Sequence, residues 1–352
     1  MTSARECPVT ICIPSNRPLA LSKASLESAI RFAGAKGYRV VISDNSGEGV
    51  KFAHFSAAPD YVTYLDNPGL PPVANLLACL DYAATEFVLP MGDDDLVEVT
   101  AGEADFDFKA LGRDVAGVRP HLEVFAVGEP VLRTHVFAID AETAADRLYE
   151  YRNKIGGDNS LYYSYFRRSD FEELIRLVET NHPTGAGDID WAIVYALLAN
   201  GKIAYDRSTI LKYDIGKWRW NEGIEASIDN IYASAGLPRQ AVAFASLFRF
   251  MDSYVFAFRR TLAVSDIERI KVLYAFAIIF LGQLLHISEK QPEQFDGFEK
   301  ELQILRAVLK EPDDYLVNVF EVCARIADRL KPGLHAQYIG WFAGVRSQSE
   351  AG

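Results

Sequence analysis

The chain places three consecutive carboxylates, Asp93, Asp94 and Asp95, directly after an apolar segment that ends at Pro90. Residues 86–90 have the pattern of the end of a buried strand. Adjacent carboxylates repel one another, and removing them from water near a sheet edge is costly unless a cation neutralises them. Because ligands of open α/β sheets bind at the carboxyl ends of strands, the cluster is a candidate site for a divalent cation. A solvated acidic turn is the alternative interpretation.

The elements that must position this cluster alternate between strand and helix over the first ninety residues. Segments 9–13, 39–42, 61–65 and 87–89 are typical of strands, and a helical pattern over about 22–32 ends at Gly34. A further helix follows Pro71-Pro72, with apolar residues at positions 73, 76, 77 and 80. This alternation predicts a largely parallel sheet with helices on its faces.

The middle of the chain is richer in strands, and its last third is helical. Segments 115–127 and 131–139 flank Gly128-Glu129-Pro130 and predict an antiparallel hairpin, and a strand over 161–166 precedes helices at about 170–179 and 188–199. Long amphipathic helices follow at about 239–262, from Ser265 with a capping-box Glu268, and after Pro312. We therefore predict an α/β domain over residues 1–217 and a helical domain over residues 218–352.

The composition limits the classes of partner. Hydrophobic residues make up 49% and charged residues 24% of the 352-residue chain, as in a globular protein with a substantial core. The net charge of −12 argues against nucleic acid as the main partner, because binding to phosphates needs a basic surface. The four cysteines show no metal-binding or disulfide spacing, so we expect a reducing, cytoplasmic setting. No signal region is apparent, and the longest apolar run, 272–281, is about half of what a spanning helix needs, so no transmembrane segment is expected.

Motifs at the strand ends resemble those of the family 2 glycosyltransferases, inverting enzymes of the GT-A fold. Residues 13–18 read Ile-Pro-Ser-Asn-Arg-Pro, similar to the family's Pro-Thr-x-Asn-Arg. Residues 43–46 read Ser-Asp-Asn-Ser, similar to its Asp-Asp-Gly-Ser. Asn75 matches an Asn near the start of the next helix, and the Asp cluster matches the family's Asp-x-Asp-Asp, with Gly92 in place of the first Asp. The order and spacing match over roughly residues 8–96.

The resemblance implies roles for these residues in binding a nucleotide-sugar donor. Asp44 would accept a hydrogen bond from the base, which suits the N3–H group of uracil or thymine and favours a UDP- or dTDP-sugar. Guanine, which also offers N–H groups, is the alternative base. An Asx turn is the alternative for Asp44. Asn75 would belong to the same donor site. The residues expected to border the nucleotide are Pro14, Ser15 and Arg17.

The resemblance also implies a metal ion in the donor site. Asp93, Asp94 and Asp95 would divide ribose contact and metal binding between them, with Asp94 aligned as the ligand and a one-residue shift to Asp95 left open. Hard oxygen ligands favour Mg²⁺ or Mn²⁺, with the donor diphosphate completing the coordination shell. Bound there, the metal acts as a Lewis acid on the leaving nucleoside diphosphate.

An inverting transfer needs a general base, which the family usually supplies as the Asp of a Glu-Asp pair eleven residues before a Gly. Asp190 precedes Gly201 by that spacing, while Ile189 replaces the Glu and Asp188 remains a second candidate. Placement in the first turn of a helix favours the ionised carboxylate that a base requires. A plain N-cap is the alternative interpretation.

Just after this helix, residues 217–220 combine two cations with two indoles: Lys217, Trp218, Arg219 and Trp220. Indole faces stack on sugar rings and the cations could reach a diphosphate, so the segment is a candidate for acceptor or diphosphate contacts. Packing at the domain junction is the alternative interpretation.

We therefore predict a metal-dependent inverting glycosyltransferase that moves a sugar from a nucleotide-diphosphate donor to a hydroxyl of a glycan or lipid-linked acceptor. On the resemblance alone, its setting would be surface polysaccharide or glycoconjugate assembly, in the cytoplasm or at the inner face of the membrane. The helical domain would bind the acceptor or mediate homo-oligomerisation. The rival hypotheses are a non-catalytic nucleotide-sugar-binding protein and a scaffold that retain the fold.

Overall fold

The computed structural model describes residues 7–185, 189–216, 230–310 and 315–350. The chain forms two compact units. The first contains Met1–Asp140, Ser160–Glu179 and Gly201–Gly216, and the second contains Ala141–Asn159, Thr180–Asn200 and Lys217–Gly352. The first unit ends next to the boundary predicted at 217, but segments 141–159 and 180–200, expected in the α/β domain, cluster with the helices of the second unit.

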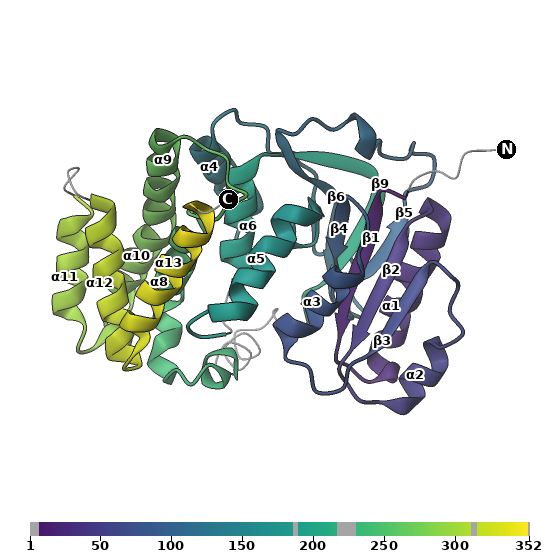
Figure 1. Ribbon diagram of the computed structural model, residues 1–352, viewed down its shortest axis with the longest axis horizontal. Coiled ribbons are helices and arrows are strands. Elements are labelled where there is room, and N and C mark those ends of the chain that lie inside the picture. The colour runs from purple at the N-terminus through teal and green to yellow at the C-terminus, as the bar shows by residue number, and fades with distance from the viewer. Residues whose placement is uncertain (1–6, 186–188, 217–229, 311–314, 351–352) are drawn as a thin grey trace. The chain divides into compact units, whose positions relative to one another are not determined.

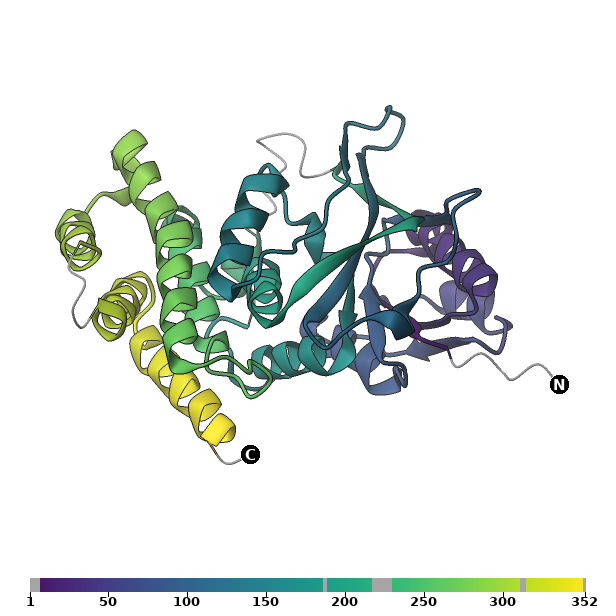
Figure 2. The ribbon, with the colours of Figure 1, turned by 90° about the horizontal axis from the view of Figure 1, so that it is seen from above.

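The first unit is built on a mixed sheet with the strand order β3-β2-β1-β4-β8-β6-β9-β5. The strands β1 (Val9–Ser15), β2 (Arg39–Asp44), β3 (Val62–Asp66) and β4 (Phe87–Pro90) are parallel to one another (Figure 1). β8 (Tyr165–Arg167) is antiparallel to β4 and to β6 (Val115–Phe125), and β7 (Arg133–His135) pairs antiparallel with β6. β9 (Lys202–Asp214) runs parallel to β6 along most of its length (Figure 2) and antiparallel to β5 (Leu96–Val99).

Helices cover both faces of the parallel strands because the β1 side chains alternate between two buried faces. Val9, Ile11 and Ile13 share a core cluster with residues of α1 (Leu19–Lys36). Cys12 points to the opposite face and is also fully buried, on the side where α3 (Pro72–Tyr82) contacts β1 and β2. The short helix α2 (Gly49–Phe55) follows β2, and α5 (Arg168–Asn181) follows β8. The predicted α/β class, with helices on both sides of the sheet and a helical region, is confirmed.

The second unit is helical. Its core includes α6 (Ile189–Asn200), in which residues 192–199 are all buried. A helix that is apolar on every side must be surrounded by other elements, which explains why α6 packs against both α4 and α8. Apart from α6, the α-helices of this unit whose two ends both lie within the described residues are α4 (Ala144–Ile155), α8 (Ala245–Phe256), α9 (Asp266–Phe276), α10 (Gly282–Lys290), α11 (Glu299–Val308), α12 (Tyr315–Leu330) and α13 (Leu334–Glu350).

Several predicted element boundaries were wrong. α1 continues past Gly34, where the missing side chain leaves room for Tyr61: a Cβ there would lie 2.6 Å from the Tyr61 hydroxyl oxygen. The predicted strand 161–166 is a 3₁₀ turn followed by the short β8, and the predicted helix 239–262 begins as a 3₁₀ helix and ends at Phe256. The sequence interpretation missed the strands β5 and β9, which lack a clear alternation of apolar and polar residues.

Among the described residues, one continuous helical stretch, Asp266–Lys290, has the length and composition of a membrane span. Half of its most apolar window is buried inside the protein, as is usual for a core helix of a globular unit.

Candidate functional site

The side chains predicted from the strand ends converge at one edge of the sheet. Ser15 ends β1 and pairs in register with Asp44, which ends β2, and the Asp cluster follows β4 on the other side of β1. Because these strands are parallel, their carboxyl ends meet at the same edge. The structure therefore brings together Ser15, Arg17, Asp44 and Asp93, as the sequence predicts.

Asp93 fastens the turn between β1 and α1. Its Oδ2 accepts hydrogen bonds from the Ser15 hydroxyl (2.7 Å) and from the backbone N–H groups of Asn16 and Arg17 (both 3.0 Å). Its Oδ1 accepts a hydrogen bond from Nε of Arg17 at 3.1 Å. A carboxylate with this many donors is held firmly in one orientation. The contacts of Asp93 are thus directed at the protein itself, and it shapes the edge of the site.

Asp94 and Asp95 differ sharply in exposure. The Asp94 side chain is 25% exposed and forms an ion pair with Nη2 of Arg17. Asp95 is buried, and its two oxygens accept hydrogen bonds from the backbone N–H groups of Asp214 (3.0 Å) and Gly92 (3.2 Å). Burial, reinforced by the nearby charge of Asp94, raises the pKa of Asp95 well above its usual range. Asp94 is therefore the carboxylate of the cluster that best meets a ligand from solvent.

The geometry explains the glycine at the position where the family has its first Asp. A Cβ on Gly92 would lie 2.7 Å from Oδ1 of Asp94 and 2.8 Å from Oδ2 of Asp95. These distances are shorter than van der Waals contact, so a side chain at position 92 would displace both carboxylates. In this chain the cluster can keep its shape only with glycine there.

A divalent cation fits this donor set only as part of a larger shell. Among the described residues, no group of three or more His, Cys, Asp or Glu side chains is arranged to hold a metal ion. Mg²⁺, however, is commonly bound through one or two carboxylates together with substrate phosphates. The partly exposed Asp94 would supply one such oxygen ligand, and Arg17 beside it would supply positive charge for a diphosphate.

A buried lysine that the sequence interpretation missed lies beneath the site. Lys51, on α2, is fully buried, and its ammonium donates hydrogen bonds to the Ser15 hydroxyl (2.6 Å), the Arg17 carbonyl (2.9 Å) and Oδ1 of Asp44 (2.9 Å). All three N–H groups are satisfied. The chain of contacts from Asp44 through Lys51 and Ser15 reaches Asp93, so the two acidic motifs are joined by one network. The only sequence signal was a lysine in an apolar segment seven residues after Asp44.

Asp44 is held in its charged form within this network. Burial alone raises the pKa of Asp44, but hydrogen bonds from the Tyr64 hydroxyl, from Lys51 and from the Ser46 backbone outweigh it and place the pKa below its usual value. The Tyr64 hydroxyl donates to Oδ2 at 2.5 Å, and the pKa of that phenol is raised by burial and by this contact. The bond to the Ser46 amide is the Asx turn considered above. Both carboxylate oxygens thus have donors inside the protein.

The remaining donor-site candidates of the first unit are mainly structural in their contacts. Asn75 is buried near the start of α3, and its Oδ1 accepts a hydrogen bond from the Ser43 hydroxyl at 2.6 Å, which attaches α3 to the end of β2. Pro14 is half-buried in β1, opposite Ser43 in the parallel register.

In the second unit, Asp190 lies in the first turn of α6 and is partly buried. Its Oδ2 accepts a hydrogen bond from Nδ2 of Asn159 at 2.9 Å. Next to it, the guanidinium of Arg249 stacks over the Trp191 ring at 4.6 Å. One oxygen of the carboxylate is thus held by the Asn159 amide, and the first turn of a helix is a favourable position for an acidic side chain.

The chain before Asp190 is fixed by His182. Its Nδ1 accepts hydrogen bonds from the backbone N–H groups of Thr184 (3.3 Å) and Gly185 (3.1 Å), so this nitrogen carries no proton. The proton is then on Nε2, which donates to Oδ1 of Asp252 at 3.0 Å. The Tyr338 hydroxyl donates to the same oxygen at 3.1 Å. This cluster ties the turn that leads towards Asp190 to α8 and α13.

Five predicted site residues lie outside the described residues. They are Asp188, Lys217, Trp218, Arg219 and Trp220, and their roles stay predictions.

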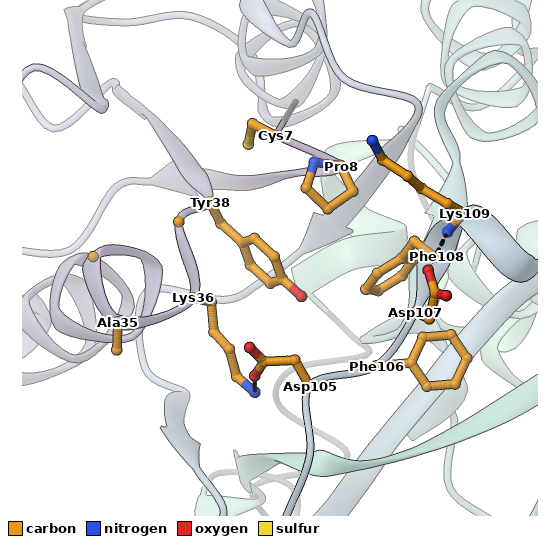
Figure 3. A pocket seen from close by; sticks show the side chains of 12 residues that line it. Cys7, Pro8, Ala35, Lys36, Tyr38, Asp105, Phe106, Asp107, Phe108 and Lys109 are labelled. Atoms are coloured by element: carbon orange, nitrogen blue, oxygen red, sulfur yellow. Dashed lines mark hydrogen bonds and ion pairs between the residues drawn. The ribbon is translucent and has the colours of Figure 1, made fainter. Parts of the chain in front are cut away.

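A separate cavity of about 690 Å³ opens at the opposite edge of the sheet, where Pro8 and Tyr38 precede β1 and β2. Figure 3 shows Lys36 directed at Asp105, to which its Nζ donates a hydrogen bond of 2.6 Å. Burial and nearby carboxylates raise the pKa of the Tyr38 phenol above its usual value. These aromatic and internally paired groups offer no arrangement for catalysis comparable to the acidic edge.

No protein-family model and no curated protein matches the sequence. Among solved structures, the chain is similar to S. aureus TarS. The alignment with TarS residues 1–349 in complex with UDP covers 98% of this chain and 90% of the TarS chain, with a TM-score of 0.48 and 13% identity. The alignment with TarS residues 1–349, with no ligand named, has the same coverage and identity and a TM-score of 0.44. The alignment with the complex of these residues and UDP-GlcNAc covers 92% of each chain, with a TM-score of 0.40 and 12% identity. At these scores, function has to be inferred from the chain's own residues.

Proposed function

We propose that the protein is a metal-dependent inverting glycosyltransferase that uses a nucleotide-diphosphate sugar, with UDP- or dTDP-sugars favoured. The observation that carries the proposal is the acidic edge, where Asp93, Asp94 and Arg17 meet Ser15 and Asp44 at the carboxyl ends of parallel strands. Burying charged groups in such a network requires a large desolvation free energy. At its exposed side, Asp94 offers a carboxylate for a cation and Arg17 a guanidinium for phosphate.

In this proposal the first unit binds the donor. Arg17 contacts the diphosphate, Asp94 ligates Mg²⁺ or Mn²⁺, and the metal supplies Lewis-acid stabilisation of the leaving diphosphate. Lys51 and Asp93 hold the turn that presents Arg17. Base recognition by Asp44 uses a remaining lone pair of its Oδ2, beside the Tyr64 hydroxyl.

The general base in this proposal is Asp190. Asp190 takes the proton of the acceptor hydroxyl as that oxygen attacks the anomeric carbon of the sugar. The bond from this carbon to the diphosphate breaks in the same step, and the nucleoside diphosphate leaves with the electron pair. One displacement inverts the anomeric configuration. The acceptor's identity, oligomerisation and the cytoplasmic location stay predictions from the sequence.

The test is a panel of UDP-, dTDP- and GDP-sugars incubated with Mn²⁺ or Mg²⁺, with donor hydrolysis and nucleoside diphosphate release as readouts. Asp94→Asn should abolish the metal-dependent part of donor binding, measured by calorimetry with and without the metal. Asp190→Asn should leave donor binding intact and remove turnover. Asp81→Asn is the matched control, because Asp81 is about half exposed and pairs with Arg176 outside the acidic edge.

Two outcomes would decide against the proposal. Metal-independent turnover that survives Asp94→Asn would refute the role of the cation and favour Arg17 as the sole diphosphate ligand. Donor binding without turnover for any acceptor would support the nucleotide-sugar-binding protein instead.

A further inference from the structure

The partner of Asp190 lies on a segment that the sequence interpretation assigned no role. Asn159 follows α4 after Gly156 and Gly157, whose φ angles of 69° and 100° reverse the chain towards α6. A residue with a side chain rarely adopts such angles, so the two glycines make this return possible. Asn159 then donates its amide to Oδ2 of Asp190 at 2.9 Å.

The two helices that carry this contact are fastened to each other. Arg147 of α4 is buried, and its guanidinium donates hydrogen bonds to the carbonyls of Leu198 (2.8 Å) and Ala199 (3.0 Å) at the end of α6. These carbonyls belong to the last turn of α6, which has no donors of its own for them. α4 and α6 are therefore locked in register, and Asn159 is held opposite Asp190 by rigid elements.

The Asn159 amide is oriented so that its NH₂ group donates to Asp190, while its own oxygen receives no hydrogen bond from the described residues. An ionised carboxylate only accepts hydrogen bonds, so the NH₂ group must face it and the amide oxygen must face away. That oxygen is buried and has no hydrogen-bond partner in the described part of the chain. The opposite orientation would give it no better partner and would set two oxygens against each other.

We propose that Asn159 is the positioning residue for the general base Asp190. It acts through Asp190: its N–H holds Oδ2 and so fixes the orientation of the carboxylate that takes the proton of the acceptor hydroxyl. This inference rests on the proposed function, because it assigns Asn159 a part in the same proton transfer. It extends that function to a segment, residues 156–159, that none of the strand-end motifs includes.

The experiment compares Asn159→Ala, Asn159→Asp and the control Asn153→Ala, an exposed asparagine on α4. The probe is hydrolysis of the panel nucleotide sugar that the wild type turns over fastest. Loss of a hydrogen bond to a charged group predicts that Asn159→Ala lowers kcat about tenfold or more while the donor KM stays unchanged. The acid limb of the pH–rate profile should move to higher pH, and further still in Asn159→Asp, where a second carboxylate opposes Asp190. A merely structural role would not move this limb.

A second readout does not require activity. With ¹³C-labelled aspartate, the Asp190 signal is assigned by its absence in Asp190→Asn, and its titration midpoint should rise in Asn159→Ala and stay fixed in Asn153→Ala. An unchanged kcat, pH profile and titration in Asn159→Ala would overturn the inference and leave the proposed function standing. A wild type that turns over no nucleotide sugar of the panel would overturn the proposed function, and this inference with it.

Discussion

Replacing Lys51 by methionine should destabilise the first unit strongly. Methionine keeps most of the apolar stem but removes the ammonium, which makes three hydrogen bonds of 2.6 to 2.9 Å inside the protein. Asp44, 1% exposed, then keeps its charge without its cation. Breaking a buried pair by removing one partner costs about 3–5 kcal/mol. That is a large part of the roughly 5–15 kcal/mol by which folded proteins are stable.

The assay is urea unfolding at neutral pH followed by far-UV circular dichroism, which reports both units. No tryptophan lies in residues 1–140, 160–179 or 201–216, so tryptophan fluorescence does not report directly on the first unit. The free energy of unfolding lost in Lys51→Met should therefore appear in the dichroism transition. If the two units unfold separately, the fluorescence transition should stay in place.

Two companion variants make the reasoning refutable. Lys23→Met removes an exposed lysine whose Nζ is 3.8 Å from Glu27, and it should cost no more than about 0.5 kcal/mol. Lys51→Met combined with Asp44→Asn should lose less than the sum of the single variants, because no unpaired charge remains. If Lys51→Met costs as little as Lys23→Met, or if the losses simply add, the buried pair is not what holds this edge together.

Three further predictions follow from the same geometry. The pKa of Asp44 is lower in the folded than in the unfolded protein, so ionised Asp44 should stabilise the fold fully above about pH 4, the pKa of an unfolded aspartate. This stabilisation should disappear as the pH falls through the lower pKa of the folded state. In acid titrations of the free energy of unfolding, Asp44→Asn should lack the loss of stability that the wild type shows. Gly92→Ala should lower the free energy of unfolding by about 1–3 kcal/mol and abolish metal-dependent donor binding, because the new Cβ would clash with two carboxylates. In the control Gly282→Ala, on α10, the new Cβ contacts nothing, so thermal unfolding should show no change or a higher stability. His182→Asn keeps an acceptor near the Nδ1 position and should retain more turnover than His182→Ala; equal losses in kcat would show that the Thr184 and Gly185 amides do not matter.

The sequence was sufficient for the acidic edge because that edge is built from local signals. Each strand of the parallel sheet is short, apolar and followed directly by its polar residues, so the order of strands along the chain places Ser15, Asp44 and Asp93 at one edge. The alternation of strands and helices fixes which ends of the strands meet. Asp190, at the start of α6, was assigned through the resemblance to the glycosyltransferase family, from its position eleven residues before Gly201, and its role as the base stays a prediction.

Which atoms contact one another was decided only by the tertiary structure. Lys51 and Asp44 are seven residues apart, and the apolar residues around the lysine are a weak local sign of its burial, which depends on the turn after β1 covering it. Asn159 and Asp190 are 31 residues apart and meet because two helices are clamped by Arg147. The assignment of α4 and α6 to the helical unit likewise depends on which neighbours cover an all-apolar helix. Local sequence determines where polar groups emerge from strands and helices, while their partners are set by long-range packing that leaves no periodic trace in the chain.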